Sequence, residues 1–327
     1  MFTNQKWIVA IGLVVAALAS TTTARTNGGT DRPVIAVVSL PYDDNDVSKG
    51  SSIPGAYVGF LESAGARVVP LLYDLPYTKL DELLDAVNGV LFTGGGLSLG
   101  ERTRYYQTAE HIFARATKLW ESAREPLPLW GTCMGFQLLC ILASGGNHSV
   151  LSEHAYDSTD VAWPLALTPA AAASFLFAPD APALRGTAAD IRAAVATRNV
   201  TFNWHPDGVD PAVWDANPAL AARLAVLSTN VDAAGRPFVS TVEGRDGRPL
   251  YATQWHPERP GYAWDTHEHP PHSDDAVAVG NWVARRFVAR ARESSHSFGT
   301  TPVPSIHDHP VTRKGDLFTY IFKPAAL

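Results

Sequence analysis

Cysteine is scarce in this chain of 327 residues, since only Cys133 and Cys140 are present. Both fall within one short apolar stretch of helical type, and at the rise of an α-helix their Cα atoms would lie about 10 Å apart. A disulfide cannot bridge that distance, so we expect none. The stability of the protein must then come from a hydrophobic core, with Cys140 as one of its residues.

The sequence also lacks any block of basic residues. Its formal net charge is −6, which argues against nucleic acid as a partner. Hydrophobic residues make up 46% and aromatic residues 10% of the chain. That composition and length allow one large α/β domain or two smaller ones.

A long apolar run is missing even at the N-terminus. Lys6 precedes the apolar residues 7–19, which are fewer than the roughly 20 that span a membrane, and small residues follow up to Ala24. The pattern predicts a signal peptide over residues 1–24 and no membrane association after cleavage, with an uncleaved anchor as the less favoured alternative. Two glycosylation sequons agree with export: Asn147-His-Ser149 and Asn199-Val-Thr201.

What the sequence does contain is organised around residues 127–143. A short apolar run of strand length turns at Gly131-Thr-Cys-Met-Gly135 and continues as an apolar helix. A strand that enters a helix through a glycine-flanked nucleophile has the form of a nucleophile elbow. Amides at the start of a helix favour a thiolate, so Cys133 is the predicted nucleophile. A buried structural cysteine is the alternative.

Apolar periodicity along the first half alternates between strand and helix. Strands are predicted at residues 33–40, 67–72 and 89–92, helices at 54–64, 80–87 and 105–123, and a loop at 41–53. This alternation predicts an α/β fold with a mostly parallel sheet covered on both faces. Ligands bind at the carboxyl ends of such strands, where Cys133 and the Gly94-Gly-Gly96 loop should meet.

The second half is less regular. Strands are predicted at residues 161–167, 220–230, 237–243 and 249–255, a helix at 274–293, and helix or loop at 169–196. No repeat or linker divides the chain. We therefore expect one catalytic domain over residues 25–295, followed by a C-terminal tail of residues 296–327 that shows no clear pattern.

The strand predicted before residue 256 ends in Gln254-Trp-His-Pro-Glu258. A thiol nucleophile needs a base, and the base needs an acceptor that orients it. Residues two apart in an extended segment point to the same side, so His256 and Glu258 can act together. Alone, this tripeptide is equally typical of a surface turn. In a chain with the cysteine elbow, it predicts a triad of Cys133, His256 and Glu258.

These two motifs together resemble the class I glutamine amidotransferase superfamily and, within it, the gamma-glutamyl hydrolases. The resemblance covers about residues 34–293 and implies a three-layer α-β-α sandwich without metal or cofactor. Further segments that carry it are Ala56-Tyr-Val-Gly-Phe-Leu-Glu-Ser-Ala-Gly-Ala-Arg-Val-Val-Pro70, Asn88-Gly-Val-Leu-Phe-Thr-Gly-Gly95, Asp160-Val-Ala-Trp-Pro-Leu165, Ser228-Thr-Asn230 and residues 258–264.

The resemblance also implies roles by position. It assigns Cys133 as nucleophile, His256 as base and Glu258 as its orienter. The backbone amides of Gly95 and Met134 match the oxyanion hole.

Substrate binding is assigned to three further positions, of which Gly94 lies in the glycine loop. His205, in Phe202-Asn-Trp-His205, matches a second active-site histidine of the family, although a satisfied structural histidine is equally favoured. Gln137 departs from the glutamate that several gamma-glutamyl hydrolases carry there. A neutral amide still accepts a hydrogen bond but supplies no charge for the α-ammonium group of the substrate.

A histidine-rich segment, His267-Glu-His-Pro-Pro-His272, precedes the last predicted helix. Its spacing matches no standard zinc pattern. We expect a solvated loop with a helix N-cap at Ser273 or Asp274, and the same interpretation applies to His307-Asp-His309. The sequence thus predicts no metal site.

The sequence therefore predicts a secreted or lysosomal/vacuolar cysteine hydrolase of small-molecule substrates. It would cleave the γ-glutamyl bonds of folate or antifolate poly-γ-glutamates through a γ-glutamyl thioester. The alternatives are a hydrolase of other γ-glutamyl amines or peptides, and a non-catalytic secreted protein that keeps the fold. A glutaminase subunit is disfavoured because no synthetase domain follows and the chain is exported. A homodimer stays open.

Overall fold

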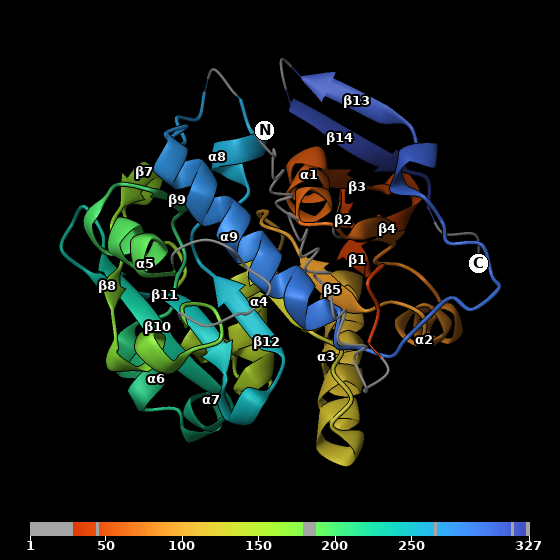
Figure 1. Cartoon of the computed structure of the whole chain (residues 1–327), viewed down its shortest axis with the longest axis horizontal. Coiled ribbons are helices and arrows are strands. Elements are labelled where there is room, and N and C mark those ends of the chain that lie inside the picture. The colour runs from red at the N-terminus through yellow and green to blue at the C-terminus, as the bar shows by residue number, and fades with distance from the viewer. Residues whose placement is uncertain (1–28, 44–45, 179–187, 265–266, 315–316, 325–327) are drawn as a thin grey trace, which may run out of the picture.

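The computed structural model describes residues 29–43, 46–178, 188–264, 267–314 and 317–324. An eight-stranded sheet forms its centre (Figure 1). Neighbouring strands are parallel from β4 to β12 and antiparallel from β12 to β8. In spatial order the strands are β4 (Arg67–Leu71), β1 (Val34–Val38), β5 (Gly89–Phe92), β6 (Leu129–Thr132), β12 (Leu250–Thr253), β11 (Pro237–Gly244), β10 (Leu224–Val231) and β8 (Ala166–Leu167).

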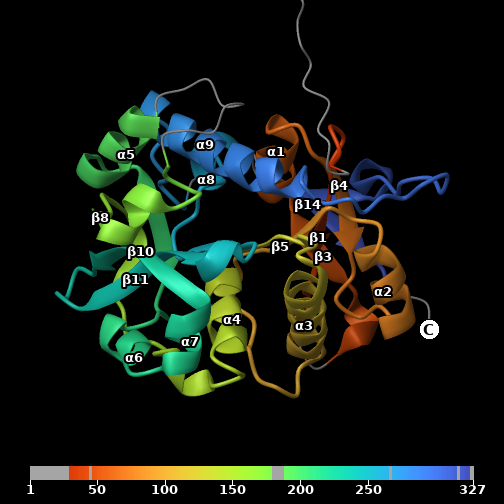
Figure 2. The same cartoon turned by 60° about the horizontal axis from the view of Figure 1, so that its bottom comes forward.

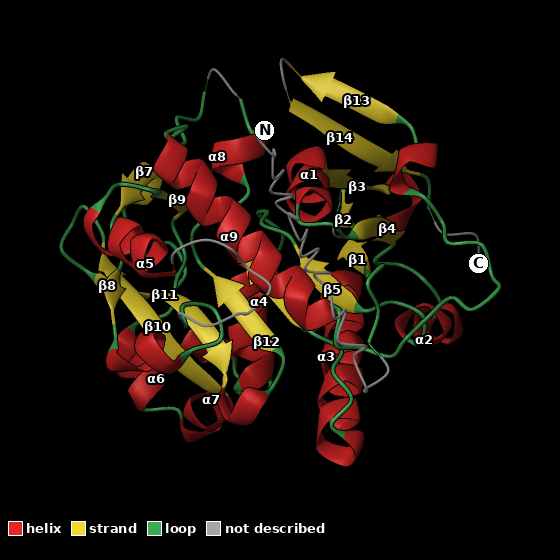
Figure 3. Ribbon diagram, in the orientation of Figure 1, coloured by secondary structure: helices red, strands yellow, loops and turns green. Residues whose placement is uncertain are grey.

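Helices cover both faces of this sheet (Figures 2 and 3). One face carries α2 (Tyr77–Leu84), α3 (Arg104–Ala123), α4 (Met134–Ala143), α6 (Pro211–Asp215) and α7 (Pro218–Arg223). The other carries α1 (Gly55–Ser63), α5 (Ala188–Thr197), α8 (Arg259–Tyr262) and α9 (Asp274–Ala291). The predicted α-β-α sandwich with a mostly parallel sheet is confirmed.

Alternation along β1 shows how the sequence builds the two cores. All five of its residues are buried. Ala36 and Val38 belong to the core under α3 and α4, whereas Ile35 and Val37 belong to the core under α1 and α9. A strand covered on both faces needs apolar side chains at every position, because successive side chains point to opposite faces. The uninterrupted apolar run is the sequence signature of that environment.

The strand that leads to the cysteine is anchored by Trp130, which is fully buried. Its ring lies 6.5 Å from that of Phe60 in α1 and 5.6 Å from that of Phe287 in α9, measured between centroids. The indole N–H donates a hydrogen bond of 2.8 Å to the hydroxyl of Thr132. Buried aromatic contacts of this kind resist displacement, so β6 presents Cys133 from a rigid base.

One predicted strand begins too early. Residues 218–223 form the helix α7, and β10 starts only at Leu224. The Asn217 side chain accepts a hydrogen bond of 3.0 Å from the Leu220 N–H, and Pro218 occupies the first turn. An Asn cap followed by proline is a helix start signal, which outweighs the apolar run that suggested a strand.

The C-terminal tail, for which the sequence offered no pattern, forms the hairpin β13 (Val311–Lys314) and β14 (Leu317–Phe322). Strand β14 pairs with β3 (Ser51–Pro54), inside the segment predicted as a loop, and β2 (Leu40–Pro41) completes a second sheet. Figure 1 shows the hairpin beside α1. The residue pattern within β14 or β3 is too weak to predict a strand, because each of these strands depends on a partner distant in the sequence.

The predicted signal peptide lies outside the described residues. Within the described part of the chain, no helix combines the length and apolar character needed to cross a membrane.

Docking of the tail is testable by truncating Tyr320, which is 4% exposed and bonds His307 Nδ1 at 2.9 Å. We expect Tyr320→Ala to lower the free energy of unfolding by about 3 kcal/mol, as for other buried aromatic side chains. Val311→Ala on the same hairpin should cost less than about 0.5 kcal/mol, because Val311 is 49% exposed. Urea unfolding measures both, and equally small losses would show that the hairpin does not dock.

Candidate active site

Cys133 occupies a strained turn between β6 and α4. Its backbone has φ 54° and ψ −107°, a left-handed conformation that non-glycine residues adopt only when their surroundings hold it. The neighbouring glycines explain how the turn closes. A Cβ at Gly131 would collide with the carbonyl of Gly135, and a Cβ at Gly135 would collide with that of Phe92. The predicted elbow is therefore present, and its glycines permit backbone contact.

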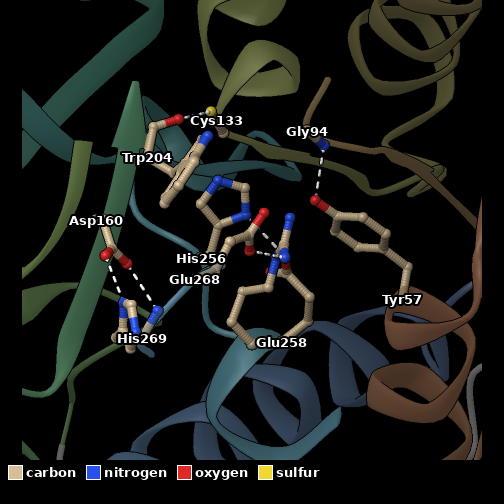
Figure 4. Close-up of polar contacts among 10 residues, drawn as sticks. Tyr57, Gly94, Cys133, Asp160, Trp204, His256, Glu258, Glu268 and His269 are labelled. Atoms are coloured by element: carbon tan, nitrogen blue, oxygen red, sulfur yellow. Dashed lines mark hydrogen bonds and ion pairs between the residues drawn. The ribbon is translucent and has the colours of Figure 1, made fainter. Parts of the chain in front are cut away.

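Cys133 is buried, with 4% of the residue exposed. The Cys133 Sγ lies 3.7 Å from the carbonyl oxygen of Trp204 (Figure 4). The backbone N–H of Cys133 donates to the carbonyl oxygen of Thr253 at 2.8 Å. Trp204 comes from β9 (Thr201–His205), which pairs with β7 (Ser158–Trp163) in a small separate sheet. Sequence reasoning missed this neighbour, because nothing local to residue 204 points to the cysteine.

His256 and Glu258 follow β12, whose neighbour in the sheet is β6. His256 Nδ1 lies 2.7 Å from Glu258 Oε1, and the two side chains are 3% and 0% exposed. Within the described part of the chain, the Nε2 atom of His256 makes no hydrogen bond. Figure 4 shows the imidazole between Glu258 and Cys133. The structure thus brings together the three residues of the predicted triad.

Gly94 packs closely against His256 and Cys133. A Cβ at Gly94 would lie 2.8 Å from His256 Cε1 and 3.3 Å from the Cβ of Cys133. Only a residue without a side chain fits there. The predicted convergence of the glycine loop with Cys133 is therefore present.

Opposing influences set the charge of the pair. Burial alone would lower the pKa of His256, but the charge of Glu258 and the proximity of Cys133 raise that pKa to about 9. Burial alone would raise the pKa of Glu258, but the charge and hydrogen bond of His256, together with Arg259, bring that pKa below its ordinary value. At neutral pH the pair is an imidazolium beside a carboxylate. Such an imidazolium stabilises an adjacent thiolate and can donate a proton.

The two residues predicted to form the oxyanion hole, Gly95 and Met134, lie close together. Met134 is the first residue of α4, so its N–H has no partner within the helix. A Cβ at Gly95 would lie 3.1 Å from Met134 Cε, which places Gly95 against the same residue. The Gly94 N–H donates instead to the hydroxyl of Tyr57 in α1 at 2.8 Å. Tyr57 is a second residue that sequence reasoning missed, since α1 is distant in the chain.

Gln137 and His205 contact the protein rather than open space. Gln137 Nε2 donates to the carbonyl of Asp207 at 3.1 Å and to Gln254 Oε1 at 3.4 Å. His205 Nδ1 lies 2.8 Å from the same Asp207 oxygen, and burial lowers the pKa of His205 to about 3. These contacts favour the structural interpretation of His205. A substrate contact by either residue stays a prediction.

The histidine-rich segment 267–272, predicted as a solvated loop, is held by contacts to two other parts of the protein, Asp160 and Arg259. The His269 N–H and Nδ1 each lie 2.7 Å from a carboxylate oxygen of Asp160 in β7. Glu268 forms an ion pair with Arg259, which follows Glu258 directly. The exposed side chain of His269 agrees with a surface position, but the segment is anchored by charge.

Neither histidine cluster gathers around a cation site. Across the described ranges, no three His, Cys, Asp or Glu side chains are grouped to hold a metal ion. Helix α9 begins after Ser273, whose side chain accepts from the Ala276 N–H at 3.3 Å, so Ser273 is the cap of the two predicted candidates. His307 is paired with Glu62 at 2.9 Å.

Comparisons of the sequence with known proteins agree with one another. The sequence model described as Peptidase C26 matches residues 33–258. Gamma-glutamyl hydrolase of Mus musculus is 33% identical over 290 residues, which are 88% of this chain and 87% of that protein. The Homo sapiens protein of the same name is 32% identical over 292 residues, with the same coverage. Gamma-glutamyl hydrolase 1 of Arabidopsis thaliana is 33% identical over 273 residues, 80% of this chain and 73% of that protein.

Among solved structures, the glutaminase domain of Trypanosoma brucei CTPS matches with a TM-score of 0.52 and 16% identity. The match covers 80% of this chain and 94% of that domain. At this identity the likeness concerns the fold alone.

The two cysteines differ enough in environment to separate their roles. Both are free thiols, but burial raises the pKa of Cys140, which lies fully buried in the core. We expect Cys133→Ala to abolish turnover without unfolding the protein, and Cys140→Ala to keep most of the activity. Iodoacetamide should label only residue 133 in the native protein. Full activity of Cys133→Ala would refute the assignment.

The pKa shifts of the buried pair fix the sign of a pH dependence. Because the pKa of His256 is raised from 6.5 to about 9, its protonated form stabilises the fold. This contribution is complete below about pH 6.5 and is lost as the pH rises through about 9. The lowered pKa of Glu258 stabilises the fold above 4.5, and this is lost at lower pH. The stability advantage of the wild type over Glu258→Gln should therefore be greatest between about pH 4.5 and 6.5.

Urea unfolding across pH 4 to 10 measures this difference. An NMR titration of His256 in Glu258→Gln should also give a pKa below the wild-type value, because the neighbouring negative charge is gone. A stability difference that does not change with pH would mean that the two groups are not coupled.

Proposed function

The chain belongs to the peptidase C26 family and is a cysteine-type gamma-glutamyl hydrolase, and on that premise we propose that it hydrolyses poly-γ-glutamylated folates through a γ-glutamyl thioester. One observation carries the mechanism. The imidazole of His256 is held by Glu258 on one side and faces Cys133 on the other, in a buried site. Nucleophile, proton carrier and orienter are the minimum set for acyl transfer.

In the first half of the reaction, the Cys133 sulfur attacks the γ-carbonyl carbon of a glutamyl residue. Negative charge develops on the carbonyl oxygen, where the amides of Gly95 and Met134 would donate hydrogen bonds. The carbon–nitrogen bond then breaks. His256 gives its proton to the leaving α-amine of the next unit, and a γ-glutamyl thioester stays on Cys133.

In the second half, water attacks the thioester carbon. His256, now neutral, takes a proton from that water, and the carbon–sulfur bond breaks to release the γ-carboxylate. The thiolate and imidazolium are restored together. The raised pKa of His256 supports this cycle, because a proton donor is required when the amine leaves.

The choice of substrate rests on the family. Relatives that align over most of the chain are gamma-glutamyl hydrolases by name, and the sequence resembles the members that cleave folylpolyglutamates. Other γ-glutamyl amines or peptides are the second candidate, favoured by the buried Gln137 in place of a charged residue.

We also propose that residues 1–24 are a signal peptide and that the enzyme acts outside the cell or in a lysosomal or vacuolar lumen. The two sequon asparagines, Asn147 and Asn199, are both exposed, which supports passage through the secretory route.

Product analysis with folate pentaglutamate tests the substrate. We expect mass spectrometry to show loss of γ-linked glutamate units, and the positions of the cuts to distinguish endo from exo cleavage. Cys133→Ala is the matched inactive control. An α-linked pentaglutamate of the same charge should stay intact.

The competing substrate is tested in the same assay. If a γ-glutamyl amine or γ-glutamyl dipeptide has a kcat/KM above that of folate pentaglutamate, the folate assignment is wrong while the hydrolase assignment stands. Failure to shorten any γ-linked substrate would overturn the proposed activity.

A further inference from the structure

Arg259 is a charged residue next to the triad for which the mechanism has no use. It is the first residue of α8 and directly follows Glu258. Its Nε lies 3.4 Å from Glu258 Oε1, and its NH1 forms an ion pair with Glu268. The Arg259 side chain is 21% exposed and that of Glu268 is 17% exposed. One guanidinium thus bridges the buried carboxylate of the triad and the histidine-rich segment.

Glu258 needs this support because its own surroundings are poor in hydrogen bonds. The side chain is 0% exposed, and in the described part of the chain its Oε2 makes no hydrogen bond. Its hydrogen bond to His256 uses only Oε1. A buried carboxylate with few donors tends to take up a proton. A protonated Glu258 would no longer hold the His256 ring in its charged form.

The groups that face Arg259 set how much of its positive charge reaches the Glu258 carboxylate. They are Glu258, Tyr57, Glu268 and Cys133. Burial raises the pKa of Tyr57 well above its ordinary value, so that hydroxyl is neutral. Glu268 takes up part of the charge of Arg259 through the ion pair with NH1, while Nε stays beside Glu258.

We propose that Arg259, held by Glu268, is a positioning residue for the proposed hydrolase reaction. It keeps Glu258 ionised and turned so that Oε1 meets His256 Nδ1. This inference rests on the proposed triad but assigns Arg259 no contact with substrate. Arginine suits the task because its planar fork can bind two carboxylates at once, whereas lysine is a point charge.

The residue after Glu268 connects the same segment to β7. The next residue, His269, binds Asp160 of β7 at 2.7 Å through both its N–H and its Nδ1. Strand β7 pairs with β9, which carries Trp204 against the thiol. The segment 267–272 therefore connects Arg259 of α8 to β7, whose partner strand β9 lies beside Cys133 (Figure 4).

The kinetic test compares Arg259→Met, Arg259→Lys and Glu268→Gln with a matched control, Arg115→Met. Arg115 also pairs with a carboxylate, Asp85, but joins α3 to the C-cap residue of α2. We expect Arg259→Met to lower kcat on a γ-glutamyl substrate about tenfold, the equivalent of one pKa unit, with KM changed less than twofold. Arg259→Lys should recover part of the loss, Glu268→Gln should lose less, and Arg115→Met should match the wild type.

A second readout needs no γ-glutamyl substrate and so separates this inference from the proposed function. The rate of iodoacetamide labelling of Cys133 is followed against pH. Without Arg259 the pKa of Glu258 rises, so the acid limb of the labelling profile should move upward by about one pH unit. Arg259→Lys should show a smaller shift.

The outcomes are decisive in either direction. Arg259→Met that only lowers the melting temperature, with an unchanged labelling profile, would show a structural role and overturn the proposal. So would a raised KM in Arg259→Met with an unshifted labelling profile, because that pattern describes a substrate contact. If no γ-glutamyl substrate is cleaved but the labelling shift appears, the positioning role stands and the substrate assignment falls.

Discussion

The structure depends on one buried pair of opposite charges, His256 and Glu258, joined at 2.7 Å and almost fully removed from water. Neither charge could be buried alone at acceptable cost. Each therefore helps to hold the other ionised, and Glu258 together with Cys133 raises the pKa of His256 to about 9. The proposed role of Cys133 as the nucleophile depends on this pair, since an imidazolium stabilises an adjacent thiolate.

The sheet supplies the geometry that the pair requires. Strands β6 and β12 are parallel neighbours, with Thr132 opposite Thr253. Cys133 leaves one strand and His256 follows the other, so both emerge at the same carboxyl edge. The strained backbone of Cys133 is kept in place by the fully buried Trp130 and by glycines that let the helix approach the sheet. Rigid packing and the strained backbone together fix the position of the Cys133 sulfur.

Contacts from distant segments complete the centre. Tyr57 of α1 holds the Gly94 amide, Trp204 of β9 lies against the thiol, and Arg259 connects Glu258 to Glu268. The first two come from different layers of the fold. None of these contacts involves a motif that would be conspicuous alone, because tyrosine, tryptophan and arginine are common in cores and ion pairs. The chemistry is concentrated in two short motifs, but its support is dispersed.

By itself, the sequence determined the local structure: the apolar runs of the parallel strands, the glycine turn around Cys133 and the spacing of His256 and Glu258. These depend on the period of side chains and on backbone freedom, which act within a few residues. Only the tertiary structure decided that the tail pairs with β3, that His205 shares the Asp207 carbonyl with Gln137, and that Arg259 reaches both carboxylates. Such contacts join residues far apart in the chain, and their energy exists only once the sheet has brought both partners together.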